Sequence, residues 1–202
     1  MSQTKRALKI TVFCSANVGL AAAITEQASV FAQGLALRGW QLLYGGGQIG
    51  LMGHFADEAL AAGGVVRGAI TESLAAGHEV AHLGLTELVI VKDLFERKKW
   101  MMEEADAFVI FPGGFGTLDE ALEVITWKAL GCHNKPILFV NVDGFWDDQL
   151  LTFQKMSEAG MIRTEGLKLF EVARSSREAL VILGVVLGVI FGVIFGVIPN
   201  KF

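Results

Sequence analysis

Short apolar runs alternate with longer segments of helical apolar spacing along this chain, and this alternation constrains the fold more than any other feature. The short runs are rich in Val, Ile, Leu and Phe and predict buried strands at Leu8–Cys14, Trp40–Tyr44, Val65–Ile70, Leu88–Val91, Ala107–Phe111 and Ile137–Asn141. The segments between and after them predict helices at Ala21–Leu37, Leu51–Ala62, Leu94–Glu104, Leu118–Leu130 and Trp146–Ala159. Elements in this order form right-handed βαβ units, so we expect an α/β fold with a doubly wound parallel sheet and helices on both faces.

Composition narrows the class of protein and its partners. With 52% hydrophobic residues and 3 prolines, the 202-residue chain is typical of one packed domain. Its net charge of -4 provides no broad basic field, so we expect no nucleic-acid partner. Cys14 and Cys132 are too few and too far apart in sequence for a disulfide framework or a zinc site, which favours a reducing, cytoplasmic location.

Loops that contain glycine follow three of the predicted strands, at the sheet edge where parallel α/β folds bind ligands. Two of them are glycine-rich, Gly45–Gly53 and Pro112–Thr117, and the third is Cys14–Gly19, with one glycine. A glycine-rich turn before a helix directs unpaired amides and the helix dipole at one point, which favours a phosphate group. Tight turns alone explain one such loop equally well, whereas two on one sheet favour phosphate binding. Neither glycine-rich loop is a P-loop, and the spacing in Gly45–Gly53 is not the dinucleotide fingerprint, so a mononucleotide is favoured over NAD or ATP.

Thr117 and Glu120 open the segment after the last of these loops in the pattern T-x-x-E, which is also the signature of a helix capping box. As part of a cap, Glu120 would contribute about 0.5–2 kcal/mol of stability and no chemistry. As a site residue, it would lie one helical turn from a phosphate bound at the loop, about the reach of a ribose. The local pattern leaves both interpretations open.

Several of these motifs, in their order and spacing, resemble the LONELY GUY family of cytokinin-activating phosphoribohydrolases, whose proteins were often labelled lysine decarboxylases. The similar residues extend roughly over 8–162 and include Gly45–Gly53, Glu96–Lys98, Pro112–Glu120, Lys135–Pro136 and Asn141–Gly144. The resemblance implies a Rossmann-like fold and hydrolysis of the N-glycosidic bond of N6-modified adenosine 5′-monophosphates, and of AMP in many bacterial members. The products are the free base and ribose 5-phosphate. It also implies a homodimer with its sites near the interface.

The same resemblance assigns site residues. It implies that Arg97 and Glu120 are the catalytic pair, with Lys98 beside them. Substrate contacts are implied or expected at the phosphate loop, the other glycine-rich loops and two further positions: Gly113, Gly114, Phe115, Gly116, Thr117, Ser15, Gly46, Gly47, Glu79 and Thr126. Without the resemblance, the charged run Glu96–Lys99 is more typical of a solvated helix face.

Cleavage of a ribosyl N-glycosidic bond builds positive charge on the sugar, and a nearby carboxylate stabilises that charge or activates the attacking water. Glu120 is the candidate, and the planar guanidinium of Arg97 would hold phosphate or ribose oxygens. A non-catalytic nucleotide or cofactor carrier is the alternative function, because a carrier needs the loops. The presence of Arg97 together with Glu120 favours the enzyme, since a carrier does not need the carboxylate.

We expect no metal and no cofactor. His78 and His82 have i, i+4 spacing, but no third ligand lies at a suitable offset, and His54 and His133 are isolated. No lysine lies in a recognisable pyridoxal-phosphate context, so a decarboxylase is not favoured.

The end of the chain differs from the rest. We expect a catalytic domain at residues 1–179 and an apolar tail at 180–202, in which Leu180–Ile198 contains no charge. As a helix this stretch would measure roughly 28 Å, close to the ~30 Å hydrocarbon thickness of a bilayer. The near-repeat within Gly188–Phe195 favours an incidental, non-native sequence. A membrane anchor ranks second, and a segment packed in a dimer ranks third.

Overall fold

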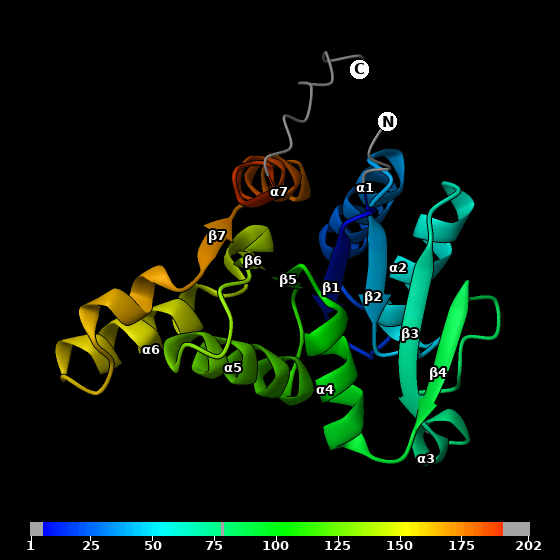
Figure 1. Ribbon diagram of the computed structural model, residues 1–202, viewed down its shortest axis with the longest axis horizontal. Helices are drawn as coiled ribbons and strands as arrows, with labels where there is room; N and C mark the ends of the chain where they lie inside the picture. The colour runs from blue at the N-terminus through cyan, green and yellow to red at the C-terminus, as the bar shows by residue number, and fades with distance from the viewer. Residues whose placement is uncertain (1–5, 78, 192–202) are drawn as a thin grey trace.

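The computed structural model describes residues 6–77 and 79–191, which form one seven-stranded parallel sheet flanked by helices (Figure 1). The strands lie in the order β4-β3-β2-β1-β5-β6-β7. Their bounds are β1 (Lys9–Phe13), β2 (Gln41–Tyr44), β3 (Val66–Thr71), β4 (Glu87–Val91), β5 (Ala107–Ile110), β6 (Ile137–Val140) and β7 (Glu171–Ala173). The predicted α/β class and doubly wound sheet are confirmed.

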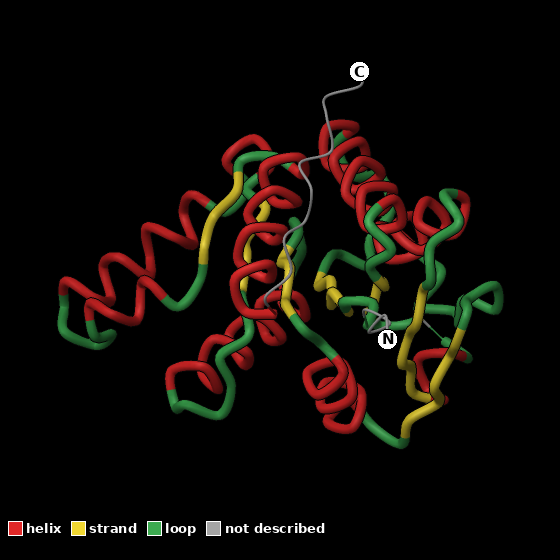
Figure 2. The backbone as a smooth tube through the Cα atoms, turned by 45° about the horizontal axis from the view of Figure 1, so that its top comes forward, coloured by secondary structure: helices red, strands yellow, loops and turns green. Residues whose placement is uncertain are grey.

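The long helices between the strands follow the predicted segments closely. They are α1 (Ala22–Leu37), α2 (Gly50–Ala61), α4 (Leu94–Glu104), α5 (Phe115–Ala129) and α6 (Asp147–Glu158). A further long helix, α7 (Ser176–Phe191), follows the last strand and overlaps the start of the expected tail. Short turns of helix occur at α3 (Glu72–Ala75), η1 (Val142–Gly144) and η2 (Thr164–Lys168). Helices cover both faces of the sheet, as the backbone trace shows (Figure 2).

Each central strand sends alternate side chains to two separate hydrophobic cores. On β5, Ala107 and Val109 pack with α1, α2 and α7, whereas Phe108 and Ile110 pack with α4, α5 and α6. This period of two is the geometry of a strand buried on both faces, and it explains why the strands read as continuous apolar runs.

The direction in which the chain adds strands to the sheet reverses between β1 and β5. From β1 it proceeds to β2, β3 and β4 on one side, and from β5 it proceeds to β6 and β7 on the other. In open α/β sheets the crevice outside the carboxyl ends of the strands at such a point is the usual ligand site. The loops after β1 and β5 flank this crevice.

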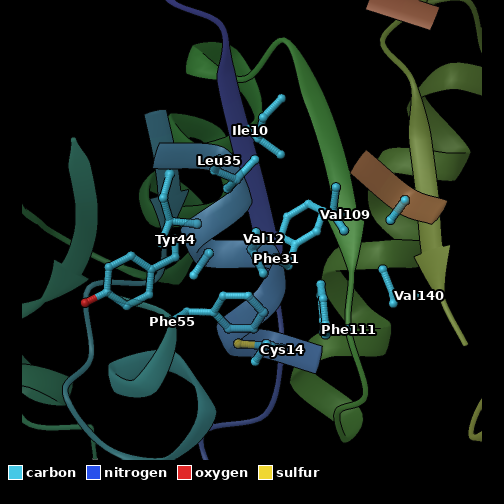
Figure 3. Close-up of a cluster of buried hydrophobic side chains, with 14 of the residues drawn as sticks. Ile10, Val12, Cys14, Phe31, Leu35, Tyr44, Phe55, Val109, Phe111 and Val140 are labelled. Atoms are coloured by element: carbon cyan, nitrogen blue, oxygen red, sulfur yellow. The ribbon is translucent and has the colours of Figure 1, made fainter. Parts of the chain in front are cut away.

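Three phenylalanines fix the helices beside the crevice. The Phe111 ring lies 5.3 Å from the Phe31 ring and 4.7 Å from the Phe55 ring, both in edge-to-face contact (Figure 3). Phe31 belongs to α1, Phe55 belongs to α2, and Phe111 directly follows β5. The start of the loop after β5 is therefore held by packing against two helices.

Helix α7 belongs to the core that contains α1. Leu180, Leu183 and Leu187 are buried there, and a Cβ on Gly34 of α1 would collide with the Leu180 side chain. At its start, Ser176 donates a 2.5 Å hydrogen bond to the carbonyl of Gln27. The boundary expected after residue 179 thus falls inside α7. The rest of the predicted tail, residues 192–202, lies outside the described residues. Within the described part of the chain, no helix is long and apolar enough to cross a membrane.

Candidate active site

The loops after β1 and β5 touch at the crevice. The backbone amide of Ser15 donates to the carbonyl of Pro112 at 3.2 Å, and the buried Ser15 hydroxyl accepts from the amide of Asn17 at 3.0 Å. The predicted substrate residue Ser15 therefore lies beside the glycine-rich segment that leads into α5.

Helix α5 starts earlier than the sequence predicted, at Phe115 instead of Leu118, with Gly114 as its N-cap. The first amides of any helix lack an intrahelical acceptor, and here no side chain caps them. Thr117 lies within the first turn, buried, and Glu120 lies in the second turn. The capping-box interpretation is wrong, because Thr117 is not the N-cap and Glu120 is too far along the helix to reach the orphan amides.

The glycines of this loop differ in what surrounds them. A Cβ on Gly113 would collide with the Thr117 side chain, whereas a Cβ on Gly114 or Gly116 would meet nothing within 4 Å. Chain packing explains Gly113 but gives no reason for glycine at the other two positions. Open space in front of unpaired amides at a helix N-terminus is the arrangement that binds phosphate.

Arg97 lies at the start of α4 and is almost fully buried. The Asp93 side chain caps this helix by accepting from the Glu96 amide at 2.9 Å, which fixes where Arg97 emerges. Its guanidinium donates to the carbonyl oxygens of Ala69 at 3.0 Å and Gly45 at 2.5 Å. A Cβ on Gly45 would collide with this guanidinium. Arg97 thus joins α4 to the ends of β2 and β3.

Glu79 accepts two further hydrogen bonds from Arg97. Nη1 and Nη2 donate to its two carboxylate oxygens at 3.3 and 2.5 Å. Glu79 begins the loop of residues 79–82, which we call the Glu79 loop. This loop is bound to the glycine-rich segment Gly45–Gly53, since the Gln48 amide donates to the carbonyls of Glu79 and Val80 at 3.1 and 2.7 Å. Gly47 packs against Glu79, where a Cβ would lie 3.2 Å from that of Glu79.

Gly46 has φ +75° and packs against β3 and Leu88. Gly46 and Gly47, both predicted to contact substrate, therefore pack within the protein in this structure. The close packing of Gly47 against Glu79 holds the Glu79 backbone near the end of β2.

Lys98 has partners that the sequence analysis gave no role. Its Nζ lies 3.0 Å from Asp119 and 2.7 Å from Glu123, both on α5. The i, i+4 spacing of these two carboxylates on one helix face was the available signal for a cation between them. The Lys98 side chain is largely buried, and it ties α4 to α5 on the side of the catalytic candidates.

Glu120 has a strongly shifted acidity. Burial raises the pKa of Glu120 to about 8, against the opposing effect of the Arg97 charge, with further raising effects of Glu79 and Asp119 and a lowering effect of Lys98. Burial, followed by the charges of Glu120 and Glu79, also raises the pKa of the Cys14 thiol. The Glu120 side chain is only partly exposed, and no hydrogen bond or ion pair to it is present within the described part of the chain. A carboxyl kept uncommitted, desolvated and near an arginine is typical of a functional site.

Two predicted residues lie apart or point outward. Thr126 lines an apolar groove of about 730 Å³ between α5, Phe153 and the segment from Met161 to Phe170, away from the glycine loop. Phe115 is 93% exposed at the start of α5. None of the other predicted site residues lines this groove.

The histidines give no metal site in the described residues. His82 binds Asp57, and no cluster of three or more His, Cys, Asp or Glu side chains that could hold a metal occurs among residues 6–77 and 79–191. His78, the other histidine of the i, i+4 pair, lies outside the described residues.

Comparison with known proteins identifies the family. A family model described as "Possible lysine decarboxylase" matches residues 52–183. A probable cytokinin riboside 5′-monophosphate phosphoribohydrolase of Oryza sativa subsp. japonica is 40% identical over 85% of this chain and 77% of its own length. The chain belongs to the LONELY GUY phosphoribohydrolase family. A second member, the cytokinin riboside 5′-monophosphate phosphoribohydrolase of Rhodococcoides fascians, is 42% identical over 76% of this chain and 77% of its own length.

Solved structures extend the likeness of fold beyond the family. The molybdenum cofactor carrier protein of Chlamydomonas reinhardtii superposes with a TM-score of 0.70 at 21% identity, covering 91% of this chain and 99% of its own. The molybdenum cofactor binding protein of Rippkaea orientalis gives 0.69 at 19% identity, covering 90% and 98%. At these identities the likeness shows the shared fold only.

Proposed function

We propose that this LONELY GUY family member hydrolyses the N-glycosidic bond of adenosine 5′-monophosphate or its N6-modified forms. The products are the free base and ribose 5-phosphate. The observation that carries the proposal is the position of Glu120 on α5, one turn beyond open, unpaired amides and beside the charges of Arg97 and Lys98. The curated relatives at about 40% identity, named for this reaction, support the same conclusion.

The first turn of α5 would bind the 5′-phosphate. The amides of Phe115, Gly116 and Thr117 face no helical acceptor, and the open space at Gly114 and Gly116 lets phosphate oxygens approach the backbone. The positive end of the helix dipole adds to this attraction. A nucleoside without its phosphate would lose these contacts and would not be placed against Glu120.

Glu120 would act on the sugar. As the bond from the anomeric carbon to the base nitrogen breaks, positive charge grows on the ribose, and the Glu120 carboxylate stabilises it. Water adds its oxygen to the anomeric carbon and loses a proton. The base leaves with the bonding electron pair and takes up a proton on nitrogen.

Arg97 and Glu79 would orient the ribose together. Of the five guanidinium hydrogens, the contacts to Ala69, Gly45 and Glu79 use four, which leaves one on Nη1 for a substrate oxygen. The Glu79 carboxylate, held by Arg97, can accept from ribose hydroxyls. The pair therefore offers both a donor and an acceptor at the edge of the crevice.

We also propose that the enzyme is a cytosolic homodimer. Support comes from exposed apolar side chains on α4, on α5 and at the C-cap of α5, namely Phe95, Phe115, Leu122 and Leu130, and from the groove lined by Thr126. An apolar surface of this kind next to a site is typical of an interface, and a partner could bring Thr126 to the other site. Light scattering tests the proposed dimer: a Leu130→Asp variant should dissociate if this surface is the interface.

The free thiols of Cys14 and Cys132 agree with a reducing compartment.

The decisive assay supplies purified protein with AMP, with an N6-isopentenyl adenosine monophosphate, and with each corresponding nucleoside, and quantifies the free base. We expect release from the monophosphates alone. A carrier would bind the nucleotides and release no base. Equal release from nucleosides would contradict phosphate binding at α5.

A further inference from the structure

His82 and Asp57 lie outside the set of proposed substrate contacts, but they hold the loop that carries Glu79. His82 is buried, and its Nε2 lies 2.9 Å from Oδ1 of Asp57 on α2. Its Nδ1 accepts from the amide of Gly84 at 3.1 Å. Because Nδ1 accepts a hydrogen bond, Nε2 carries the ring proton and donates to Asp57.

The backbone around His82 continues this attachment. The His82 amide donates to the carbonyl of Gly46 at 3.0 Å, and Gly47 and Ala81 form an antiparallel bridge. Between Glu79 and Ala81, Val80 has φ +47°, a left-handed conformation that a β-branched residue adopts only under constraint. The loop is therefore kept in an unfavourable shape by contacts at its ends. Arg97 holds one end through Glu79, and His82 holds the other.

We propose that His82 and Asp57 are positioning residues that hold the Glu79 loop against the segment Gly45–Gly53. In this position Glu79 meets both Arg97 and the bound ribose. The inference deepens the proposed function and depends on it for the contact with ribose. The ring of His82 anchors the loop to α2, a helix fixed to the sheet by Phe55. Without this anchor, the strain at Val80 favours release of the loop.

Variants at both positions test the proposal in the full-length protein. His82→Leu and Asp57→Ala remove the contact from either side. His82→Gln keeps an amide donor at about the reach of Nε2. The matched control is Glu58→Ala, because Glu58 is the next residue of α2 and its carboxylate accepts from Gln33 of α1 at 2.6 Å, away from the loop.

Backbone hydrogen exchange gives a readout that does not need activity. The amides of Gln48 and His82 bridge the loop and the glycine-rich segment. We expect them to exchange about tenfold faster or more in His82→Leu and Asp57→Ala, close to the unaltered rate in Glu58→Ala, and at an intermediate rate in His82→Gln. Unchanged exchange in His82→Leu and Asp57→Ala would overturn the proposal.

Steady-state kinetics with AMP tests the consequence for the site. We expect kcat/KM to fall about tenfold or more in His82→Leu and Asp57→Ala, chiefly through KM, because a misplaced Glu79 weakens the hold on ribose. His82→Gln should recover most of the loss, and the double variant should lose no more than either single one. Faster exchange with unaltered kcat/KM would show that the pair positions nothing for catalysis. If the unaltered protein releases no base, the proposed function fails, and amide exchange alone decides whether the pair holds the loop.

Discussion

Arg97 and Glu79 form a two-point contact in which Nη1 and Nη2 donate to the two carboxylate oxygens at 3.3 and 2.5 Å. Their side chains are only 8% and 16% exposed, so each charge depends on the other for compensation. Removal of one partner from a buried pair leaves an unsatisfied charge, which costs more than loss of the pair itself.

Arg97→Ala should lower the free energy of unfolding by about 3–5 kcal/mol, because Glu79 then remains buried without its partner. The double variant Arg97→Ala/Glu79→Ala should be more stable than Arg97→Ala alone. Urea unfolding of the four proteins in this cycle measures both effects. Strictly additive losses would contradict a coupled pair. Activity should be lost in both Arg97 variants.

Glu120→Gln should reduce kcat by about a hundredfold or more, since a neutral amide cannot stabilise charge on the sugar. Base release from AMP provides the measurement. Glu103→Gln, on the exposed face of α4, serves as the control and should retain activity. Retained turnover in the Glu120 variant would remove Glu120 from the mechanism.

The same variant should be more stable than the unaltered protein at high pH. The folded pKa of Glu120, about 8, lies above its ordinary value of 4.5, so the folded state binds this proton more tightly than the unfolded state. The stabilising effect of this tighter proton binding is fully present below pH 4.5 and is lost as the pH rises through 8. Glu120→Gln should therefore raise the melting temperature at pH 8.5, and the difference should shrink toward pH 5. A lower melting temperature at pH 8.5 would contradict the raised pKa.

The pH dependence of the reaction should follow the same group. If the carboxylate is the active form, kcat/KM rises with pH to an inflection near 8, because kcat/KM reports the free enzyme. Initial rates with AMP between pH 5 and 10 provide the test. A fall across this range would indicate that the protonated carboxyl acts as an acid.

The glycines of the loop that we propose binds phosphate should separate stability from binding. Gly116→Ala should leave the fold intact and raise its stability slightly, because alanine favours a helix by about 1 kcal/mol and no atom lies within 4 Å of the added Cβ. Its KM for AMP should rise about tenfold, since the methyl group occupies space proposed for phosphate. Gly113→Ala should instead destabilise the fold through Thr117. Calorimetry and kinetics on both variants distinguish the two roles.

Much of the fold was predictable from the sequence because its strands are buried on both faces. Continuous apolar runs such as Ala107–Phe111 carry this signal directly. The three-residue strand β7 (Glu171–Ala173) was missed because it is too short for such a run. Residues 180–202 were treated as a separate tail, although Leu180, Leu183 and Leu187 have the spacing of one buried helix face.

The site was predictable only where its residues are local in sequence. Gly113 to Glu120 follow one another, so their shared loop and helix could be read directly. The role of Arg97 in tying Gly45 to Glu79 depends on contacts across 52 and 18 residues, which no local pattern contains. His82 was weighed as a metal ligand and rejected, but its partner Asp57 could not be named, because their contact spans 25 residues.

The pairing of β1 with β5 has a consequence for how the protein acquires its site. Ile10 pairs with Ala107, so the intervening chain must close into a loop before the crevice between these strands exists. Contacts so distant in sequence form slowly, since the entropy of loop closure is lost before the contacts compensate for it. Nucleotide binding during refolding would therefore report the arrival of the complete sheet, and a nascent chain would remain unable to bind until β5 has been synthesised.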